Sequence, residues 1–353
     1  MAKKKEDQQA REQAFDRFKR DLKAGNFGQF YIFFGEEAYL RENYTAQLVK
    51  KLSDGPAAEF NVHRFAQENF SPEAFSDAVE AMPMMAERTL ITVDDVDLFA
   101  MPEAERDKMC SVLSDIPEWC CIVFSYDTVA WKLNKQYKKL ADVIVKNAQI
   151  VEFAKQSERM LLDWVAKHFH AEGKTISEDD ARYLLFLTDS SMSVLAGEIG
   201  KLASYASGTE VRKSDIDAVV VPVLTAQSFQ ISDAIAKGEF EKALRILQDL
   251  FAMQTEPLMI LGAIGSQLRR MHYAKLITGC GKGQETLMAL AEIRSSYAAG
   301  LTMQAARRVS DGFCKKAVEL CLEADRTIKS SLDEPERTLE VLIAQLSGEA
   351  RRG

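Results

Sequence analysis

The sequence has few of the features that mark secreted, membrane-spanning or metal-binding proteins. Its 353 residues include six cysteines and four histidines, and no two cysteines have the Cys-x-x-Cys spacing typical of zinc or redox sites. No uninterrupted apolar stretch approaches the ~20 residues that a membrane-spanning helix needs, and the first residues lack the apolar core of a secretory signal. We therefore expect a cytoplasmic protein without a bound metal, whose cysteines serve as small core residues.

An excess of basic charge is also missing. The chain carries 45 basic and 53 acidic residues, a net charge of −8, so we expect no overall attraction to nucleic acid. A local basic run is formed by Lys132, Lys135, Lys138 and Lys139. Lysines at this spacing usually form a solvated helix face, and weak contact with a DNA phosphate backbone is the alternative interpretation.

Strand and helix patterns alternate through the first half of the chain. Helical patterns, including a lysine-rich helix at 132–140, separate five apolar runs. This alternation predicts a mostly parallel sheet covered by helices on both faces. We predict an α/β domain over residues 25–154, preceded by an N-terminal extension, residues 1–24, with a mobile start and a short helix at its end. The expected strands are 30–34, 61–65, 89–93, 120–124 and 149–153.

Beyond residue 154 the patterns indicate helices without strands. We predict a small helical domain over residues 155–222 and a larger helical domain over residues 223–353, with one long amphipathic helix at 303–329. The larger domain is rich in small residues and methionine, which suits packing against neighbouring subunits, and packing only on itself fits the pattern equally well. The predicted fold class is α/β plus all-α.

The turn after the first strand has the spacing of a phosphate-binding loop without its chemistry. A P-loop requires Gly-x-x-x-x-Gly-Lys-Ser/Thr between a strand and a helix, but residues 35–42 read Gly-Glu-Glu-Ala-Tyr-Leu-Arg-Glu. We predict a degenerate, non-binding loop at Gly35, Glu36 and Glu37, whose carboxylates would repel an anion and cap the helix dipole. A nucleotide-binding switch ATPase with an unusual phosphate loop remains the alternative.

Two further features deserve an interpretation. Asp94 and Asp95 end the third strand, where a Walker B carboxylate would position Mg²⁺. Because the phosphate-binding lysine is missing, we interpret them as polar strand-end residues. The second feature is the apolar segment Met82, Pro83, Met84 and Met85.

In that segment, Pro83 ends a helix on whose buried face we expect Met82. Methionine is an adaptable residue that is common on partner-binding surfaces, so exposed side chains here could insert into an apolar pocket. The alternative is that these residues cap the core of the sheet.

Six segments, spread in order over about 300 residues, together resemble the delta subunit of the bacterial DNA polymerase III clamp loader. The first runs from Phe34 to Glu37, and the second, 81–88, leads into the third strand. Trp164-Val165 and three helical segments complete the set. Those helical segments are 198–202, 229–235 and 325–329.

The resemblance implies an AAA+-like parallel-sheet domain without a working ATP site, a small helical lid and a helical collar domain for oligomerisation. It implies a subunit of the DNA polymerase III holoenzyme, a DNA-directed DNA polymerase and hence a nucleotidyltransferase, with no catalysis of its own and no cofactor. The implied partners are the sliding clamp, the ATP-hydrolysing loader subunits, the delta-prime subunit, and primed DNA through the assembled complex. The implied place is the replisome in the cytoplasm.

The resemblance also assigns a role to the methionine segment. Met84 and Met85 match the position of the hydrophobic plug that enters the clamp, while Met82 and Pro83 would set its angle. Members of the family often have Leu or Phe here, so the methionine pair is a departure. The implied function is to bind the clamp and open its ring for loading onto primed DNA during replication. Another AAA+-like adaptor, in repair or transcription, is the remaining alternative.

Overall fold

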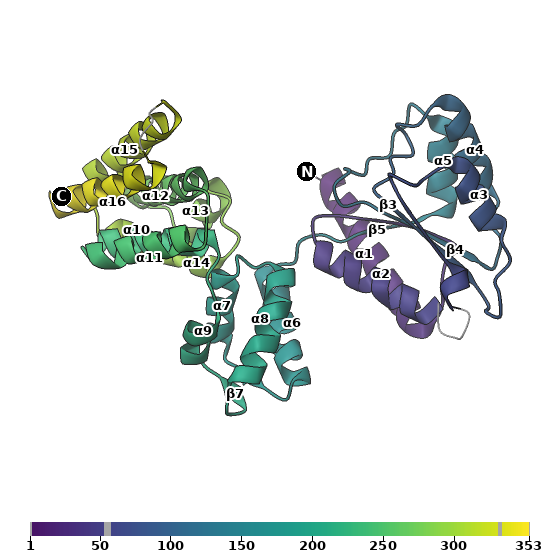
Figure 1. Ribbon diagram of the computed structural model, residues 1–353, viewed down its shortest axis with the longest axis horizontal. Helices are drawn as coiled ribbons and strands as arrows, with labels where there is room; N and C mark the ends of the chain where they lie inside the picture. Colours follow the sequence, from purple (N-terminus) through teal and green to yellow (C-terminus); the bar gives the residue numbers. More distant parts are fainter. Residues whose placement is uncertain (1, 53–57, 331–333, 353) are drawn as a thin grey trace. The chain divides into compact units, whose positions relative to one another are not determined.

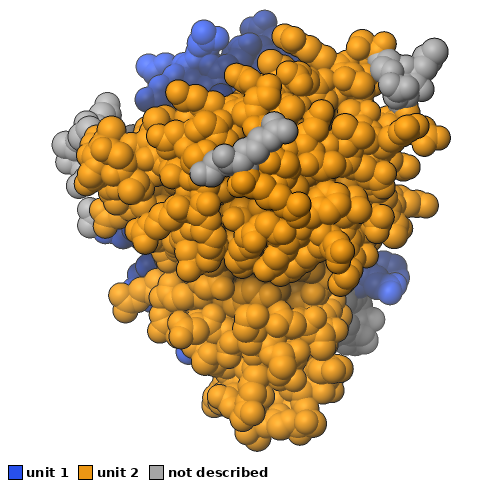
Figure 2. Space-filling model, turned by 90° about the vertical axis from the view of Figure 1, so that its left-hand side faces the viewer, with its two compact units in different colours: residues 1–156 blue, residues 157–353 orange. Residues whose placement is uncertain are grey.

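The computed structural model describes residues 2–52, 58–330 and 334–352 (Figure 1). The chain forms two compact units, residues 1–156 and 157–353, which Figure 2 distinguishes by colour. The first unit contains a five-stranded sheet, and the second is built almost entirely from helices. The predicted class, α/β plus all-α, is confirmed. The predicted division of the second unit at residue 222 stays a prediction.

The sheet of the first unit is parallel throughout, with strand order β2-β3-β4-β1-β5. All five predicted strands are present, each within two residues of its expected ends. The three inner strands, β3, β4 and β1, are buried at nearly every position because both of their faces are covered. The strands are β1 (Phe30–Phe34), β2 (Val62–Ala66), β3 (Thr89–Asp94), β4 (Cys120–Ser125) and β5 (Gln149–Glu152).

Alternate side chains of β1 enter two separate cores, as the two-residue period of a strand requires. Phe30 and Ile32 pack among helices on one face, whereas Tyr31 and Phe33 pack against helices on the other. The first face is covered by α3 (Pro72–Glu80), α4 (Glu103–Ser114) and α5 (Lys138–Asn147), and the second by α1 (Ala2–Ala24) and α2 (Ala38–Leu52) (Figure 1).

The N-terminal segment differs from the expectation of a mobile start and a short helix. α1 is a continuous helix of 23 residues. Phe18 and Leu22 are buried in the core beneath it, where the Phe18 ring lies 5.0 Å from that of Phe33 and 5.5 Å from that of Tyr31. The weak apolar stripe therefore serves to cover the sheet, and α1 belongs to the first unit.

The predicted lysine-rich helix at 132–140 is wrong over most of its length, because α5 begins only at Lys138. The chain before it is irregular and is held by aromatic contacts instead. The ring of Trp131 lies 5.0 Å from that of Tyr126 and 6.0 Å from that of Phe99. Leu133 also packs against the core. Tertiary packing of these apolar residues outweighs the helix propensity of the lysines.

The second unit contains eleven helices among its described residues. One short parallel pair, β6 (Thr175–Ile176) with β7 (Glu210–Val211), contradicts the expectation that no strand follows residue 154. Two-residue strands are too short to leave a periodic pattern. The helices are α6 (Glu158–Ala171), α7 (Glu178–Leu187), α8 (Met192–Tyr205), α9 (Lys213–Val219), α10 (Leu224–Ala236), α11 (Phe240–Ala252), α12 (Pro257–Gly279), α13 (Gln284–Leu290), α14 (Ser296–Arg307), α15 (Asp311–Ser330) and α16 (Pro335–Arg352).

The long helix predicted at 303–329 is two helices. α14 ends at Arg307 and α15 begins at Asp311. The hydroxyl of Ser310 accepts a hydrogen bond of 3.1 Å from the backbone N–H of Phe313, so Ser310 caps the second helix. An amphipathic pattern continues across the break because both helices bury their apolar faces in the same core.

A charged contact joins the first helix of this unit to α14. The carboxylate of Glu158 accepts hydrogen bonds from the backbone N–H and the hydroxyl of Ser296, at 2.7 and 2.9 Å. Arg182 of α7 forms an ion pair with the same carboxylate. The helices before and after residue 222 are therefore bonded to each other within the unit.

No single helix among the described residues is both long and apolar enough to cross a bilayer. The pair α9 and α10, bent by 109° at the break between them, meets the length and composition test only when the two are taken together. Most residues of α10 are buried in the core of the second unit.

Candidate functional site

The methionine segment projects from the first unit. α3 ends at Glu80, and the following residues form an irregular loop that leads into β3. The side chains of Met82, Met84 and Met85 are 78%, 54% and 84% exposed. The expectation that Met82 lies on a buried helix face is wrong, because the helix stops two residues earlier. The alternative in which these side chains cap the sheet core does not fit such exposure.

A buried amide fixes the middle of this loop. Asn61, 2% exposed, stands just before β2. Its Oδ1 accepts a hydrogen bond of 2.6 Å from the backbone N–H of Met84, and its Nδ2 donates one of 2.8 Å to the carbonyl of the same residue. Both polar backbone groups of Met84 are thus satisfied, and its side chain is left free for contact with solvent or a partner. Met85 follows with φ = 52°, a left-handed conformation that is uncommon for a residue with a side chain.

A fourth large apolar side chain is exposed beside this anchor. Phe60, 67% exposed, immediately precedes Asn61, so the hydrogen bonds of Asn61 bring the backbone of Phe60 near that of Met84. We call Phe60, Met82, Met84 and Met85 the tip surface. Sequence patterns did not single out Phe60, because a lone aromatic residue next to a strand gives no sign of its exposure.

The turn at Gly35 requires glycine for two reasons. Its φ of 126° is one that side-chain-bearing residues rarely adopt, and an added Cβ would stand 2.4 Å from the carbonyl oxygen of Phe153. That carbonyl accepts a 2.9 Å hydrogen bond from the N–H of Glu37, and the N–H of Phe153 donates one of 2.7 Å to Phe34. The turn is therefore fastened to the chain that follows β5.

Arg41 occupies the position where a P-loop has its lysine. The side chain is buried, and it donates a 2.8 Å hydrogen bond to the carbonyl of Gly35 and forms an ion pair with Asp127. The guanidinium thus bonds to the turn itself and to the loop after β4. This contact cross-links two loops at the carboxyl ends of neighbouring strands, where a nucleotide would approach a P-loop fold.

The two glutamates of the turn have different roles. Glu37 is buried at the start of α2, and burial raises the pKa of its carboxyl even though the carboxylate accepts a hydrogen bond from the N–H of Tyr39. Glu36 lies 3.7 Å from the ammonium group of Lys155. Glu37 therefore caps the start of α2, as the sequence predicts.

The Asp94-Asp95 pair has a structural explanation. Asp95 adopts φ = 55°, and its carboxylate accepts hydrogen bonds from the N–H groups of Asp127, Thr128 and Val129 and from the hydroxyl of Thr128. Burial alone would raise the pKa of Asp95, but these bonds outweigh it and the pKa lies below its usual range. Burial, followed by the neighbouring charge of Asp95, raises the pKa of Asp94. Asp95 therefore anchors the loop that carries Asp127.

The lysine run does not form one helix face. Lys139, in the first turn of α5, pairs with Asp107 of α4 at 3.1 Å. Lys132 and Lys135 lie in the irregular segment and Lys138 starts the helix, and all three side chains are exposed. Three of the four lysines thus remain candidates for contact with an anionic partner.

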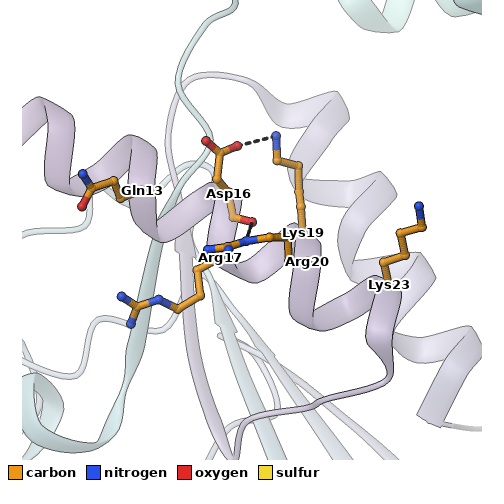
Figure 3. A pocket seen from close by; sticks show the side chains of 6 residues that line it. All are labelled: Gln13, Asp16, Arg17, Lys19, Arg20 and Lys23. Atoms are coloured by element: carbon orange, nitrogen blue, oxygen red, sulfur yellow. Dashed lines mark hydrogen bonds and ion pairs between the residues drawn. The ribbon is translucent and has the colours of Figure 1, made fainter.

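A second basic surface lies on α1, on the side opposite to its buried stripe. Figure 3 shows Arg17, Arg20 and Lys23 among the side chains that line a pocket along this helix. Acidic residues interrupt it, since Asp16 pairs with Lys19 at 2.7 Å and its backbone carbonyl accepts a hydrogen bond from Arg20. The surface is a mixed-charge face, which is common on solvated helices.

Metal-binding and redox chemistry have few candidate residues in the described structure. Among residues 2–52, 58–330 and 334–352, no three His, Cys, Asp or Glu side chains are grouped in a way that could hold a metal ion. Five of the six cysteines are buried, as expected for small core residues, but Cys280 at the end of α12 is exposed.

Family models give the comparison that bears on identity. The model of the DNA polymerase III delta subunit matches residues 31–154, and the model of the C-terminal domain of the same subunit matches residues 225–346. Together they account for more than half of the chain. The chain belongs to the DNA polymerase III delta subunit family.

Individual relatives agree with this assignment. The DNA polymerase III subunit delta of Bacillus subtilis (strain 168) is 25% identical over 334 residues, covering 93% of this chain and 95% of the relative. The probable DNA polymerase III subunit delta of Aquifex aeolicus (strain VF5) is 21% identical over 279 residues, covering 76% of each. The solved structure of the Bacillus subtilis DNA clamp loader delta protein has a TM-score of 0.59 at 23% identity, covering 95% of this chain and 99% of that chain. That likeness supports the fold.

The delta-family match over residues 31–154 contains the tip surface, the Gly35 turn and Arg41. Sequence reasoning found the methionines and the glycine but missed the two residues that hold these loops. For Arg41, the sequence contains one indication of a role, its place at the lysine position of the P-loop spacing. For Asn61 it contains no indication, because its partner Met84 is 23 residues away.

Proposed function

We propose that this delta-family chain is the clamp-loader subunit that binds the sliding clamp through the tip surface and favours opening of its ring for loading onto primed DNA. The observation that carries the proposal is the exposure of three methionines on a loop whose backbone is fixed by Asn61. The family assignment supports the proposal, because delta-like proteins have a hydrophobic plug at the position of Met84 and Met85.

The tip surface suits insertion into an apolar pocket. Burying one such side chain contributes about 1.5–3 kcal/mol, so Met84 and Met85 could act as the small set of residues that dominates an interface. Because Asn61 already orders the backbone, less conformational entropy would be lost on binding.

Ring opening would follow from preferential binding. A protein that binds an open clamp more tightly than a closed one shifts the population toward the open state by the ratio of the two affinities. The ATP-hydrolysing loader subunits would reposition this chain, which contributes no catalysis to the holoenzyme. Its place in the cell would be the replisome.

The Gly35 turn supports a subunit without ATP hydrolysis. Arg41 bonds to Gly35 and Asp127, and Glu37 occupies the helix start that would receive a phosphate. A nucleotide-binding switch ATPase is the alternative, and tight Mg²⁺-dependent ATP binding by the isolated protein would favour it. The other alternative is a different AAA+-like adaptor. Clamp binding would distinguish the proposed function from that alternative.

The second unit would join the other loader subunits, including delta-prime, as a collar. Support comes from apolar side chains that its packing leaves exposed. Those side chains are Met253, Met259, Leu276, Leu290 and Leu322.

The experiment is a binding titration of the isolated protein with its own sliding clamp. Met84→Ala/Met85→Ala is expected to weaken binding about tenfold or more, since truncating a central apolar contact costs on the order of 2 kcal/mol. Met253→Ala/Met259→Ala makes the same chemical change at exposed methionines of the second unit and should leave clamp binding unchanged. Equal affinity of the tip variant and the wild type would exclude the proposed surface.

A further inference from the structure

The tip surface gathers three exposed methionines on one short loop. Met85 and Met82 are the two most exposed methionines in the part of the chain that the structure describes. Met109, Met192 and Met271 are buried in cores, with exposures of 0%, 1% and 0%. Three thioethers that follow one another within four positions are thus open to reagents in solution.

We propose that the tip surface is a site of reversible methionine oxidation, and that oxidation of Met84 and Met85 releases the clamp. This inference rests on the proposed clamp-binding function for its consequence, but the oxidation itself depends only on the exposed sulfur atoms. The oxidant is a peroxide, with hydrogen peroxide as the simplest member of the class.

The chemistry is a two-electron oxygen transfer. A lone pair of the methionine sulfur attacks one oxygen of hydrogen peroxide, the S–O bond forms, and the O–O bond breaks. The departing oxygen takes up the remaining proton and leaves as water, so the sulfur is oxidised and the peroxide is reduced. Methionine sulfoxide reductases reverse the step with two thiols, which become a disulfide while the oxygen leaves as water.

The modification changes the property on which the tip surface depends. A sulfoxide is polar and accepts hydrogen bonds, so its burial in an apolar pocket leaves a strong dipole without a partner. An unpaired polar group of this kind reduces affinity about tenfold or more.

Oxidation should leave the fold intact. Asn61 holds Met84 through its backbone N–H and carbonyl, and neither core formed by the described residues of the first unit includes a tip methionine. The loop would therefore keep its position while its surface becomes polar. This separates the tip from the buried methionines, whose oxidation would disrupt packing.

The first measurement locates the oxidation. The full-length protein is treated with graded hydrogen peroxide and digested, and sulfoxide is quantified at each methionine by mass spectrometry. Met82 and Met85 are expected to react first, Met84 with or shortly after them, and Met109 and Met271 last. Oxidation of the tip no faster than that of the buried methionines would overturn the proposal.

The second measurement determines the effect on binding. Clamp affinity is compared before and after peroxide treatment for the wild type and for Met82→Leu/Met84→Leu/Met85→Leu, which keeps an apolar tip that peroxide cannot oxidise. Wild type should lose about tenfold or more in affinity and regain it with methionine sulfoxide reductases and dithiothreitol. The leucine variant should bind before and after treatment alike, although its other exposed methionines, such as Met259, still react.

The outcomes separate this inference from the function on which it rests. If untreated wild type does not bind the clamp, the proposed function fails, whatever the mass spectra show. If untreated wild type binds and the oxidised protein binds equally well, the function stands and the oxidation switch is wrong. Equal losses in wild type and the leucine variant would place the sensitive methionine elsewhere and also overturn it.

Discussion

Glu37 is an acidic side chain that folding removes from water. Burial raises its pKa above the ordinary value of 4.5, against the opposing effects of Lys155, the Tyr39 N–H and Arg41. A carboxyl whose pKa is higher in the folded state favours folding in its protonated form. Its contribution is fully present below pH 4.5 and is lost as the pH rises through the folded pKa.

We predict that Glu37→Gln stabilises the protein at pH 7 and has little effect below pH 4. Glutamine keeps an acceptor for the N–H of Tyr39 and removes the charge that burial disfavours. The measurement is urea unfolding across this pH range. Glu36→Gln, which removes a charge from an exposed side chain, is the matched control, and an equal change in both variants would argue against a role for burial.

Individual residues differed in how far the sequence could predict them. Gly35 was identifiable because a sharp turn between an apolar strand and a helix favours glycine, and the structure adds the close approach of Phe153 as a second reason. The residue pattern around Pro83 left the exposure of Met84 open, and the resemblance to the delta subunit favoured it. The contacts of Arg41 and Asn61 could not be predicted, because their partners lie 86 and 23 residues away in the chain.

Asn61, which immediately precedes β2, holds the tip loop through two hydrogen bonds to Met84. Asn61→Ala removes both hydrogen bonds to Met84 and leaves the backbone of the loop without them. We predict a loss of about 2 kcal/mol in the free energy of unfolding and weaker clamp binding, since the clamp would then have to order the loop. Chemical denaturation and the clamp titration measure the two effects.

The control for this prediction is Asn61→Asp. Aspartate keeps an acceptor for the N–H of Met84 but loses the donor to its carbonyl and buries a charge, so at pH 7 it should be no more stable than Asn61→Ala, and protonation of the carboxyl at low pH should recover part of the loss. If Asn61→Ala is as stable as the wild type and binds the clamp equally well, the loop does not depend on this anchor.

Whole elements were predictable where burial imposes a period on the sequence. The inner strands β1 and β4 are covered on both faces, so they appear as nearly continuous apolar runs. The segment 132–137 was misassigned because its lysines suggest a helix while Trp131 and Leu133 pack in an irregular conformation. α1 was underestimated because, over its residues 11–24, only a narrow stripe that includes Phe18 and Leu22 is buried.

At the level of the whole molecule, charge is spread unevenly over an acidic chain. The net charge is −8, yet Lys132, Lys135 and Lys138 follow one another without an acidic residue between them. We propose that these lysines contact the phosphate backbone of primed DNA in the assembled loader. The basic face of α1 is less suited to this role because Asp16 and Asp21 interrupt it.

We predict that Lys132→Glu/Lys135→Glu/Lys138→Glu lowers the affinity of the assembled loader for primed DNA. It should also reduce the slope of log affinity against log salt by up to about 3, near one unit per lost phosphate contact. Fluorescence anisotropy over a range of salt concentrations measures both.

The matched control reverses three charges on α1, as Arg17→Glu/Arg20→Glu/Lys23→Glu. It produces the same change in net charge and should leave the salt slope at the wild-type value. Unchanged DNA affinity in the lysine variant would exclude the proposed contact. A loss of DNA affinity confined to the α1 variant would assign the DNA contact to the basic face of α1 instead.

The ion pair of Arg41 with Asp127 bears on the evolutionary history of the turn. Any single mutation toward a phosphate-binding lysine at position 41 first removes contacts that hold Gly35 and Asp127 together. The missing glycine at Leu40 and hydroxyl at Glu42 would still leave that lysine without a complete site. Each intermediate variant on this path would thus lose stability before it gained an activity. Single substitutions toward a phosphate-binding loop would therefore cost stability without supplying a complete site.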